Sequence, residues 1–302
     1  MLPLTLLLAL SALSADDPLA ARLRPLVDAH QGKVAVGIKH LFSGQSYYHN
    51  PDLVMPTASL IKVAVLVEAY LQADEGKIQL REPVTLRDSD RVPGSGILSY
   101  HFSDGVTLPL RDVVRLMIAL SDNTATNLVL DKVGIERVNA RMAQWGLKET
   151  RINAKVFRGS VTSVDPARTK QYGLGSTTAR EMIRLFERVQ TGEGLRPPIR
   201  LAMLEHLKKN DDRDKFARLL PPGVVVAHKD GAVSEARTDA GILYTPAGPI
   251  LVCVLTSDNA DRRWVRDNAG NLLCARIARL AYDYFNDPAR AAPIQQKAGS
   301  TP

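Results

Sequence analysis

The sequence predicts an α+β fold: an antiparallel sheet built from both chain ends and flanked by helices, with an inserted all-α lobe. Strand-like runs occur near the N-terminus, at 33–49, and again at 224–257. Helical patterns fill most of the chain between these two regions. An α/β lobe is therefore expected at about 18–55 and 220–286, and an α lobe at about 56–219.

The composition is that of an ordinary globular protein, with 302 residues of which 45% are hydrophobic and 24% charged. The formal net charge is +7, but Lys and Arg are scattered along the chain. Without a basic stripe interleaved with aromatic residues, a nucleic-acid partner is not expected. A cationic surface would instead suit a location beside an acidic polymer, such as a cell envelope.

The two ends of the chain are expected to lie outside the folded domain. Residues 1–15 form an apolar run too short to span a bilayer, followed by the acidic pair Asp16 and Asp17. This pattern predicts a signal peptide, and hence an exported protein, periplasmic or secreted, without stable membrane insertion. The domain is expected at 16–286, with a disordered tail at 287–302.

The first elements predicted are a helix, a hairpin and a buried helix. Residues 18–31 carry apolar positions at helical spacing, and 33–41 alternate before a Ser-Gly turn leads into 45–49. From 60 to 71 the chain is apolar on nearly every side. Such a segment is typical of a helix in the centre of a large domain.

The remaining elements follow from the same periodicities and from turn signals. Residues 76–108 are irregular, and 150–176 form a long loop, which in a compact domain is usually functional or disordered. Strands are expected at 224–229, 239–244 and 250–257. Helices are expected at 110–120, 127–132, 135–145, 177–190, 197–208 and 264–285.

The start of the buried helix carries a candidate nucleophile and base. Ser59 lies where this helix should begin, and Lys62, three residues later, shares its face. Burial should lower the pKa of Lys62 and make its amine a candidate base for the Ser59 hydroxyl. The alternative is a capping serine followed by a lysine that extends to the surface.

Two further strings follow in chain order. A Ser-Asp-Asn triplet at 121–123 follows a predicted helix of the α lobe, and Lys-Asp-Gly at 229–231 follows a predicted strand. Alone, the triplet is typical of a cap or turn, and Lys-Asp-Gly of a hairpin tip. The second serine lies 62 residues after Ser59, and Lys229 lies 170 residues after it.

This set of strings resembles the class A serine β-lactamases and the wider penicillin-recognising family over roughly residues 20–285. The resemblance implies a β-lactamase/transpeptidase-like fold and a serine hydrolase that opens a β-lactam ring through an acyl-enzyme. It also implies a small-molecule substrate, no cofactor, no metal and a monomer. Similar strings surround the motifs, at 94–98, 116–127, 131–134, 176–178 and 238–241.

The resemblance assigns catalytic roles by position. Ser59 would be the nucleophile, and Lys62 would accept or relay its proton. Ser121 and Lys229 would complete a path that delivers a proton to the leaving nitrogen.

It also assigns substrate contacts. Asn123 would hold the substrate's side-chain amide, and the backbone N–H groups of Ser59 and Ala232 would form an oxyanion hole next to Gly231. Donors of this kind contribute about 10²–10³ in rate. Lys229 would attract the substrate carboxylate, aided by Arg237 on the next strand.

The first departure from the family concerns the deacylating base. Class A enzymes place a glutamate in the loop after the α-lobe helices. Here Val156 falls at that position, and no glutamate occurs between Glu149 and Glu181. The nearest substitute is Asp165, followed by a proline; the alternative is that Asp165 is a plain turn residue.

The second departure is Asp230, where the family usually carries Thr or Ser, a hydroxyl that helps bind the substrate carboxylate. An aspartate there would repel that carboxylate unless it turned away or paired with a cation such as Arg237. Neither departure touches the groups that acylate.

Two alternatives keep the Ser59 acyl-enzyme. The protein could be a D-Ala-D-Ala peptidase or esterase-like hydrolase, or a binder that traps β-lactams without releasing them. A metal-dependent lactamase is not expected, because the histidines at 30, 40, 49, 101, 206 and 228 show no ligand spacing. Cys253 and Cys274 are either two buried free thiols or one disulfide between a strand and the following helix.

Overall fold

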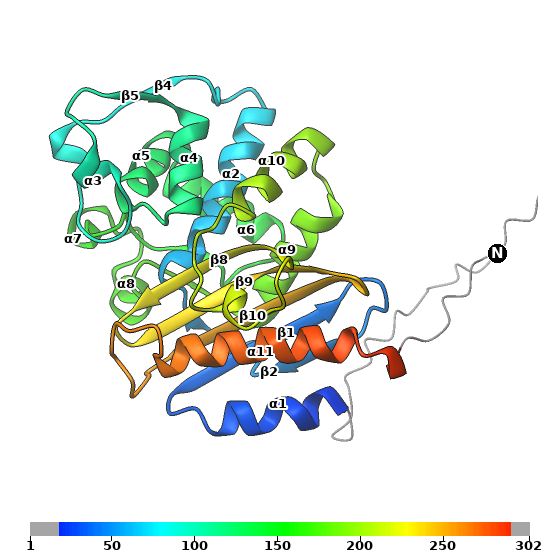
Figure 1. Cartoon of the computed structure of the whole chain (residues 1–302). Helices are drawn as coiled ribbons and strands as arrows, with labels where there is room; N and C mark the ends of the chain where they lie inside the picture. Colours follow the sequence, from blue (N-terminus) through cyan, green and yellow to red (C-terminus); the bar gives the residue numbers. More distant parts are fainter. Residues whose placement is uncertain (1–17, 291–302) are drawn as a thin grey trace, which may run out of the picture.

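The computed structural model describes residues 18–290. Figure 1 shows a sheet with helices on both faces below a group of helices. The signal peptide expected at 1–15 lies outside the described residues. Of the tail expected at 287–302, Pro288–Arg290 form the short 3₁₀ turn η4, and 291–302 lie outside the description.

The central sheet draws its strands from both ends of the described chain, which confirms the predicted architecture. Its order is β2-β1-β10-β9-β8, and all neighbours are antiparallel. The first and last thirds of the chain meet where β1 pairs with β10. The strands are β1 (Lys33–His40), β2 (Ser46–His49), β8 (Val225–Val233), β9 (Ala236–Thr245) and β10 (Gly248–Ser257).

Helices α1 (Pro18–Asp28) and α11 (Ala269–Phe285) pack on one face of the sheet, and α9 (Ala179–Thr191) covers the other (Figure 1). Helix α9 falls within the range predicted for the α lobe, 56–219, but it belongs to the α/β lobe. It packs on the sheet because Gly37 leaves room for it: a Cβ at Gly37 would lie 2.7 Å from Cγ1 of Ile183.

The cysteines face opposite sides of the sheet. Cys253 on β10 belongs to the core under α9, whereas Cys274 on α11 belongs to the core on the other face. Both are buried and unpaired. Alternate residues of a strand point to opposite faces of the sheet, and Cys253 points away from the face on which α11 packs. The disulfide considered above is therefore not formed.

The α lobe surrounds α2 (Lys62–Asp74), which is buried on nearly every side, as its sequence predicted. The helices around it are α4 (Leu110–Ala119), α5 (Asn123–Val133), α6 (Ile135–Gln144) and α10 (Pro197–Leu207). The segment predicted to be irregular, 76–108, contains β4 (Pro83–Thr85), η2 (Asp88–Asp90), α3 (Leu98–His101) and β5 (Thr107–Pro109).

The predicted loop at 150–176 contains short elements instead. These are β6 (Arg151–Ile152), α7 (Gly159–Thr162), α8 (Pro166–Tyr172) and β7 (Gly175–Thr177). With β3 (Met55–Pro56), the two short strands form a small sheet of order β3-β7-β6. None of these elements is long enough to leave a periodic pattern in the sequence.

Helix α11 begins five residues later than predicted, at Ala269 instead of 264. The side chain of Asn268 caps it by accepting from Gly270 N at 2.9 Å. The same side chain donates to the carbonyls of Asp261 and Arg263 at 2.9 and 3.0 Å. These bonds hold the preceding segment as a loop.

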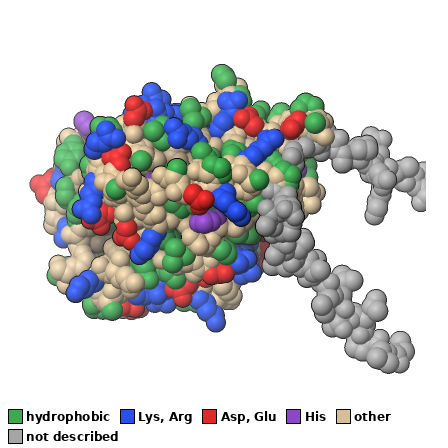
Figure 2. Space-filling model, turned by 90° about the horizontal axis from the view of Figure 1, so that it is seen from below, with side chains coloured by type: hydrophobic (Ala, Val, Ile, Leu, Met, Phe, Trp, Pro, Cys, Tyr) green, Lys and Arg blue, Asp and Glu red, His purple; other side chains and the backbone are tan. Residues whose placement is uncertain are grey.

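On the face seen in Figure 2, basic and acidic side chains are interspersed. That distribution matches the scattered Lys and Arg of the sequence. From 18 to 290, no helix combines the length and the apolar character needed to cross a bilayer.

Candidate active site

A cavity of about 900 Å³ opens where the α lobe meets the edge strand β8. Lys62 and Lys229 are fully buried behind its wall. The structure therefore brings together residues that lie up to 170 positions apart in the sequence. The lining includes five of the predicted site residues: Ser59, Ser121, Asn123, Ala232 and Arg237.

Ser59 lies in the 3₁₀ turn η1 (Ala58–Ile61), directly before α2. It is not the helix cap considered above, since the N-cap of α2 is Ile61. The preceding residue, Ala58, has φ of 46°, a left-handed conformation that costs about 1–3 kcal/mol for a non-glycine residue. Such strain persists only where the surroundings enforce it.

Contacts to the sheet enforce this turn. Thr57 O accepts from Leu60 N at 3.1 Å and from Thr238 Oγ1 on β9 at 2.8 Å. Gly231 on β8 makes the close approach possible, because a Cβ there would lie 2.4 Å from Thr57 O. The predicted binding strand thus lies against the turn that carries Ser59.

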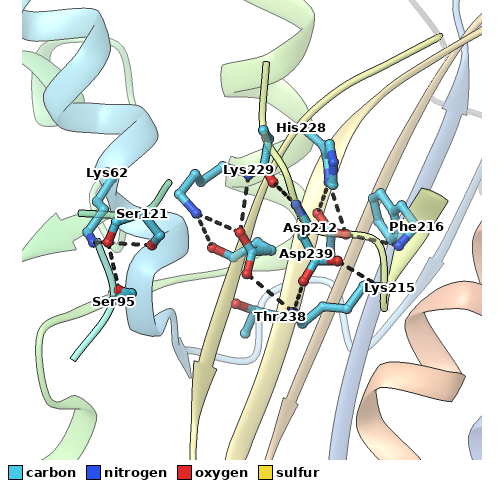
Figure 3. A network of polar contacts seen from close by, with 12 residues as sticks. Lys62, Ser95, Ser121, Asp212, Lys215, Phe216, His228, Lys229, Thr238 and Asp239 are labelled. Atoms are coloured by element: carbon cyan, nitrogen blue, oxygen red, sulfur yellow. Dashed lines mark hydrogen bonds and ion pairs between the residues drawn. The ribbon is translucent and has the colours of Figure 1, made fainter. Parts of the chain in front are cut away.

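Lys62 donates three hydrogen bonds from its buried amine, and Figure 3 shows its contact with Ser121. They go to Ser121 O at 2.6 Å, Ser121 Oγ at 3.2 Å and Asn123 Oδ1 at 3.0 Å. Burial lowers the pKa of Lys62 well below its ordinary value, and the charge of Lys229 lowers it further. An amine that loses its proton so readily can act as a base toward a neighbouring hydroxyl.

The triplet at 121–123 lies at the start of α5. Asp122 caps this helix by accepting from Ala125 N at 2.8 Å, and its other oxygen accepts from Ile97 N and Leu98 N at 2.7 and 2.9 Å. The middle residue of the triplet therefore ties the loop at 94–98 to α5, while its neighbours face the cavity.

Ser95, in that loop, is a site residue that the sequence analysis did not name. Its hydroxyl donates to Ser121 O at 2.8 Å and lies 3.4 Å from Asn123 Oδ1. Asn123 also donates from Nδ2 to Pro93 O at 3.0 Å, which leaves its second N–H for a ligand. The only sequence feature that pointed to Ser95 was its place within the segment at 94–98, which resembles the family.

Lys229 directs its amine at its neighbour Asp230, with Nζ–Oδ1 at 2.6 Å and Nζ–O at 2.9 Å. Lys215 approaches the other carboxylate oxygen at 3.2 Å, and Asn210 Nδ2 donates to Oδ1 at 3.1 Å. Burial alone would raise the pKa of Asp230, but the charges of Lys229 and Lys215 outweigh it and hold the pKa well below its usual range.

Arg237 is not the cation that pairs with Asp230. Its guanidinium donates to the carbonyls of Val233, Ala236 and Arg263. It also lies 4.8 Å from the ring centroid of Trp264. Asp230 is paired with cations, as considered above, but they are Lys229 and Lys215 and not Arg237. Lys215 belongs to an ordinary charged run at 211–215, which carries no signal for this role.

Comparison with known proteins agrees with this geometry. The model of the beta-lactamase enzyme family matches residues 18–285. The chain belongs to this family. Its fold is that of the class A serine β-lactamases.

Relatives of this β-lactamase family member cover most of its length. A beta-lactamase of Streptomyces cellulosae is 28% identical over 250 residues, or 80% of this chain and 78% of the relative. The crystal structure of a beta-lactamase from Sphaerobacter thermophilus has a TM-score of 0.77 at 29% identity, over 88% of this chain and 96% of that chain. A mutant of PBP-A, solved as its acyl-enzyme complex with penicillin G, has a TM-score of 0.76 at 28% identity, with the same coverage.

Val156, which the resemblance places where class A β-lactamases carry the deacylating glutamate, lines the cavity. The side chain of Asn127 holds the backbone of Val156 through two hydrogen bonds: Val156 N donates to Asn127 Oδ1 at 2.8 Å, and Asn127 Nδ2 donates to Val156 O at 3.0 Å. The sequence analysis did not name Asn127 as a site residue.

Asp165, the proposed substitute base, lies elsewhere. Its side chain caps α8 by accepting from Arg168 N at 3.0 Å, and it is not among the residues that line the cavity. This arrangement matches the turn-residue alternative. Within residues 18–290, no cluster of three or more His, Cys, Asp or Glu side chains could hold a metal ion.

Proposed function

We propose that this protein is an exported serine hydrolase that opens β-lactam rings through an acyl-enzyme on Ser59. The observation that carries the proposal is the fully buried amine of Lys62, bonded to Ser121 and placed one helical turn from Ser59 at the cavity. The names of its relatives as beta-lactamases support the substrate class. The basis for export is the apolar run at residues 1–15.

The proposed acylation begins at the Ser59 hydroxyl. Ser59 Oγ attacks the lactam carbonyl carbon while Lys62 takes the hydroxyl proton. The backbone N–H groups of Ser59 and Ala232 stabilise the oxyanion. When the C–N bond breaks, the proton reaches the lactam nitrogen through Ser121. Water then cleaves the ester, which releases the ring-opened acid and restores Ser59.

A second candidate function follows from Val156. This side chain cannot activate water, and the nearest aspartate in the loop, Asp165, caps a helix. Slow deacylation would make the protein a β-lactam-trapping binder, or a peptidase or esterase whose natural acyl-enzyme is released more easily.

Intact mass spectrometry over time, with benzylpenicillin and a cephalosporin, tests the proposal. We expect an adduct of the ligand's mass, lost in the Ser59→Ala variant and retained in Ser103→Ala, a matched change at an exposed serine outside the cavity. An adduct that decays as product accumulates identifies a hydrolase, whereas one that persists identifies the binder. An adduct on Ser59→Ala contradicts the assignment of the nucleophile.

A further inference from the structure

Two buried lysines converge on one carboxylate at the cavity. Lys229 is fully buried and Lys215 nearly so, and their amines approach the two oxygens of Asp230 at 2.6 and 3.2 Å. Asn210 donates to the same carboxylate, and Lys215 also pairs with Asp212 at 2.7 Å. Figure 3 shows this polar network running from Lys229 toward Lys215 and Asp212. Two cations arranged in this way form a binding position for an anion, and Asp230 occupies it.

The other described cations along the cavity also have partners. Lys155 pairs with Asp131, and Arg266 pairs with Asp214 at 3.0 Å. Arg237 donates its N–H groups to backbone carbonyls. Along the described wall of the cavity, an incoming carboxylate therefore finds each cation either paired with a carboxylate or hydrogen-bonded to backbone carbonyls.

We propose that Asp230 is a specificity-determining residue: it fills the anion position of Lys229 and Lys215, so that the site selects acyl donors without a carboxylate beside the scissile bond. This inference rests on the proposed acylation of Ser59 and names the substrate class within it. Neutral β-lactams and uncharged esters or amides are the donors that fit.

The physical reason for this selectivity is the free-energy cost of bringing a second carboxylate to Lys229. A donor carboxylate that reaches Lys229 either displaces Asp230 from two buried lysines or lies beside it as a like charge. Even at an effective dielectric constant of ~20, the repulsion between two like unit charges about 4 Å apart is several times the free-energy difference that changes a rate tenfold. We therefore expect a preference of about tenfold or more for the neutral donor.

Benzylpenicillin and its methyl ester provide a matched pair, since they differ only in the carboxylate. The measurement is the second-order rate constant for adduct formation on Ser59, followed by quenched intact mass spectrometry. Each constant is divided by the rate of hydroxide hydrolysis of the same compound. For the wild-type protein we expect the methyl ester to react about tenfold faster or more.

Asp230→Asn keeps the shape of the side chain and removes its charge, and Asp230→Ser is a smaller second variant. In both, the ratio should shift at least tenfold toward benzylpenicillin. Asp214→Asn is the control, because it removes a carboxylate from the same cavity that pairs with Arg266 and not with Lys229. Its ratio should stay at the wild-type value.

The ratio of the two rate constants for the wild-type protein tests the role of Asp230 even if the Asp230 variants do not fold. Equal rates, or a faster reaction of benzylpenicillin, overturn the role of Asp230 and leave the Ser59 acyl-enzyme intact. A ratio that Asp230→Asn leaves unchanged in a folded protein overturns it as well. No adduct with either compound overturns the proposed function, and the inference with it.

Discussion

Thr238 Oγ1 on β9 donates a hydrogen bond of 2.8 Å to Thr57 O, which lies 181 residues earlier in the chain. This bond joins strand β9, in the C-terminal third of the chain, to the turn that carries Ser59. The same carbonyl also accepts from Leu60 N, which closes the turn. The position of Ser59 is therefore set by the sheet as well as by the turn η1 and the helix α2 that follows it.

Gly231→Ala tests this relationship. The new Cβ would lie 2.4 Å from both Thr57 O and Thr238 Oγ1, so β8 and the turn must separate. Overpacking of this kind costs about 1–3 kcal/mol of unfolding free energy. We expect that loss in urea denaturation, together with slower acylation of Ser59.

Gly159→Ala is the matched control, because its Cβ would meet Thr169 at an ordinary 3.4 Å. Its unfolding free energy should stay within about 0.5 kcal/mol of wild type. If Gly231→Ala behaved like this control in both stability and acylation, the close approach of β8 to η1 would have no part in positioning Ser59.

Lys62→Arg tests the base. Arginine carries a permanent positive charge and cannot accept a proton, so acylation should fall by roughly 10²–10⁴-fold. Lys148→Arg, a change at an exposed lysine, should leave the rate unchanged. Stopped-flow or quenched mass measurements of acylation would check both.

The pH dependence of acylation has a definite sign. Burial lowers the pKa of Lys62, so its amine is neutral above that lowered pKa and protonated below it. Acylation by wild type should therefore fall as the pH drops through this value and level off above it. A rate that rises as the pH falls would exclude neutral Lys62 as the proton acceptor.

Val156→Glu tests the missing deacylating base. The backbone at this position is held by Asn127, and the residue lines the cavity that contains Ser59. A carboxylate placed there could activate water, and a general base contributes about 10²–10⁴-fold. We expect the adduct lifetime to shorten by at least tenfold in Val156→Glu but not in Val156→Gln, which has the same shape without the base.

Stability at mildly acidic pH should depend on His206. Burial lowers its pKa to about 4, and Tyr70 Oη lies 2.5 Å from its Nε2. Between an unfolded pKa of about 6.5 and this value, only the unfolded state takes up the proton. As the pH is lowered from about 6.5 to about 4, the unfolding free energy should therefore decrease, by at most about 3 kcal/mol.

The measurement is urea denaturation from pH 7 to pH 4, compared with His206→Gln. The difference between the two proteins isolates His206 from other titrating groups. That difference should shrink or reverse as the pH falls, and a difference independent of pH would contradict the assignment.

The fold could be predicted because its evidence is local. Alternating residues marked the strands, and the all-round apolar run marked α2, which the structure places in the centre of the α lobe. The same approach missed the short elements at 150–176 and the start of α11, where single caps such as Asn268 set the boundary. It also put α9 in the α lobe, because periodicity shows that a face is buried but not what buries it.

The candidate site likewise has a part that could be predicted from the sequence and a part that could not. Ser59, Lys62 and the triplet at 121–123 could be predicted as short motifs at a given spacing. The structure brings Ser59, Ser121 and Asn123 to one cavity, with Lys62 and Lys229 buried behind its wall. Residue type and order along the chain suffice for such motifs. What surrounds them depends on contacts between segments that are far apart in sequence.

Those long-range contacts came from the tertiary structure alone. It pairs Asp230 with Lys215 and leaves Arg237 hydrogen-bonded to backbone carbonyls. A charged side chain has the same sequence signature whether it lies in solvent, caps a helix or neutralises a buried partner. Only the packing of the sheet against the α lobe distinguishes these environments, and with them the chemistry the site can perform.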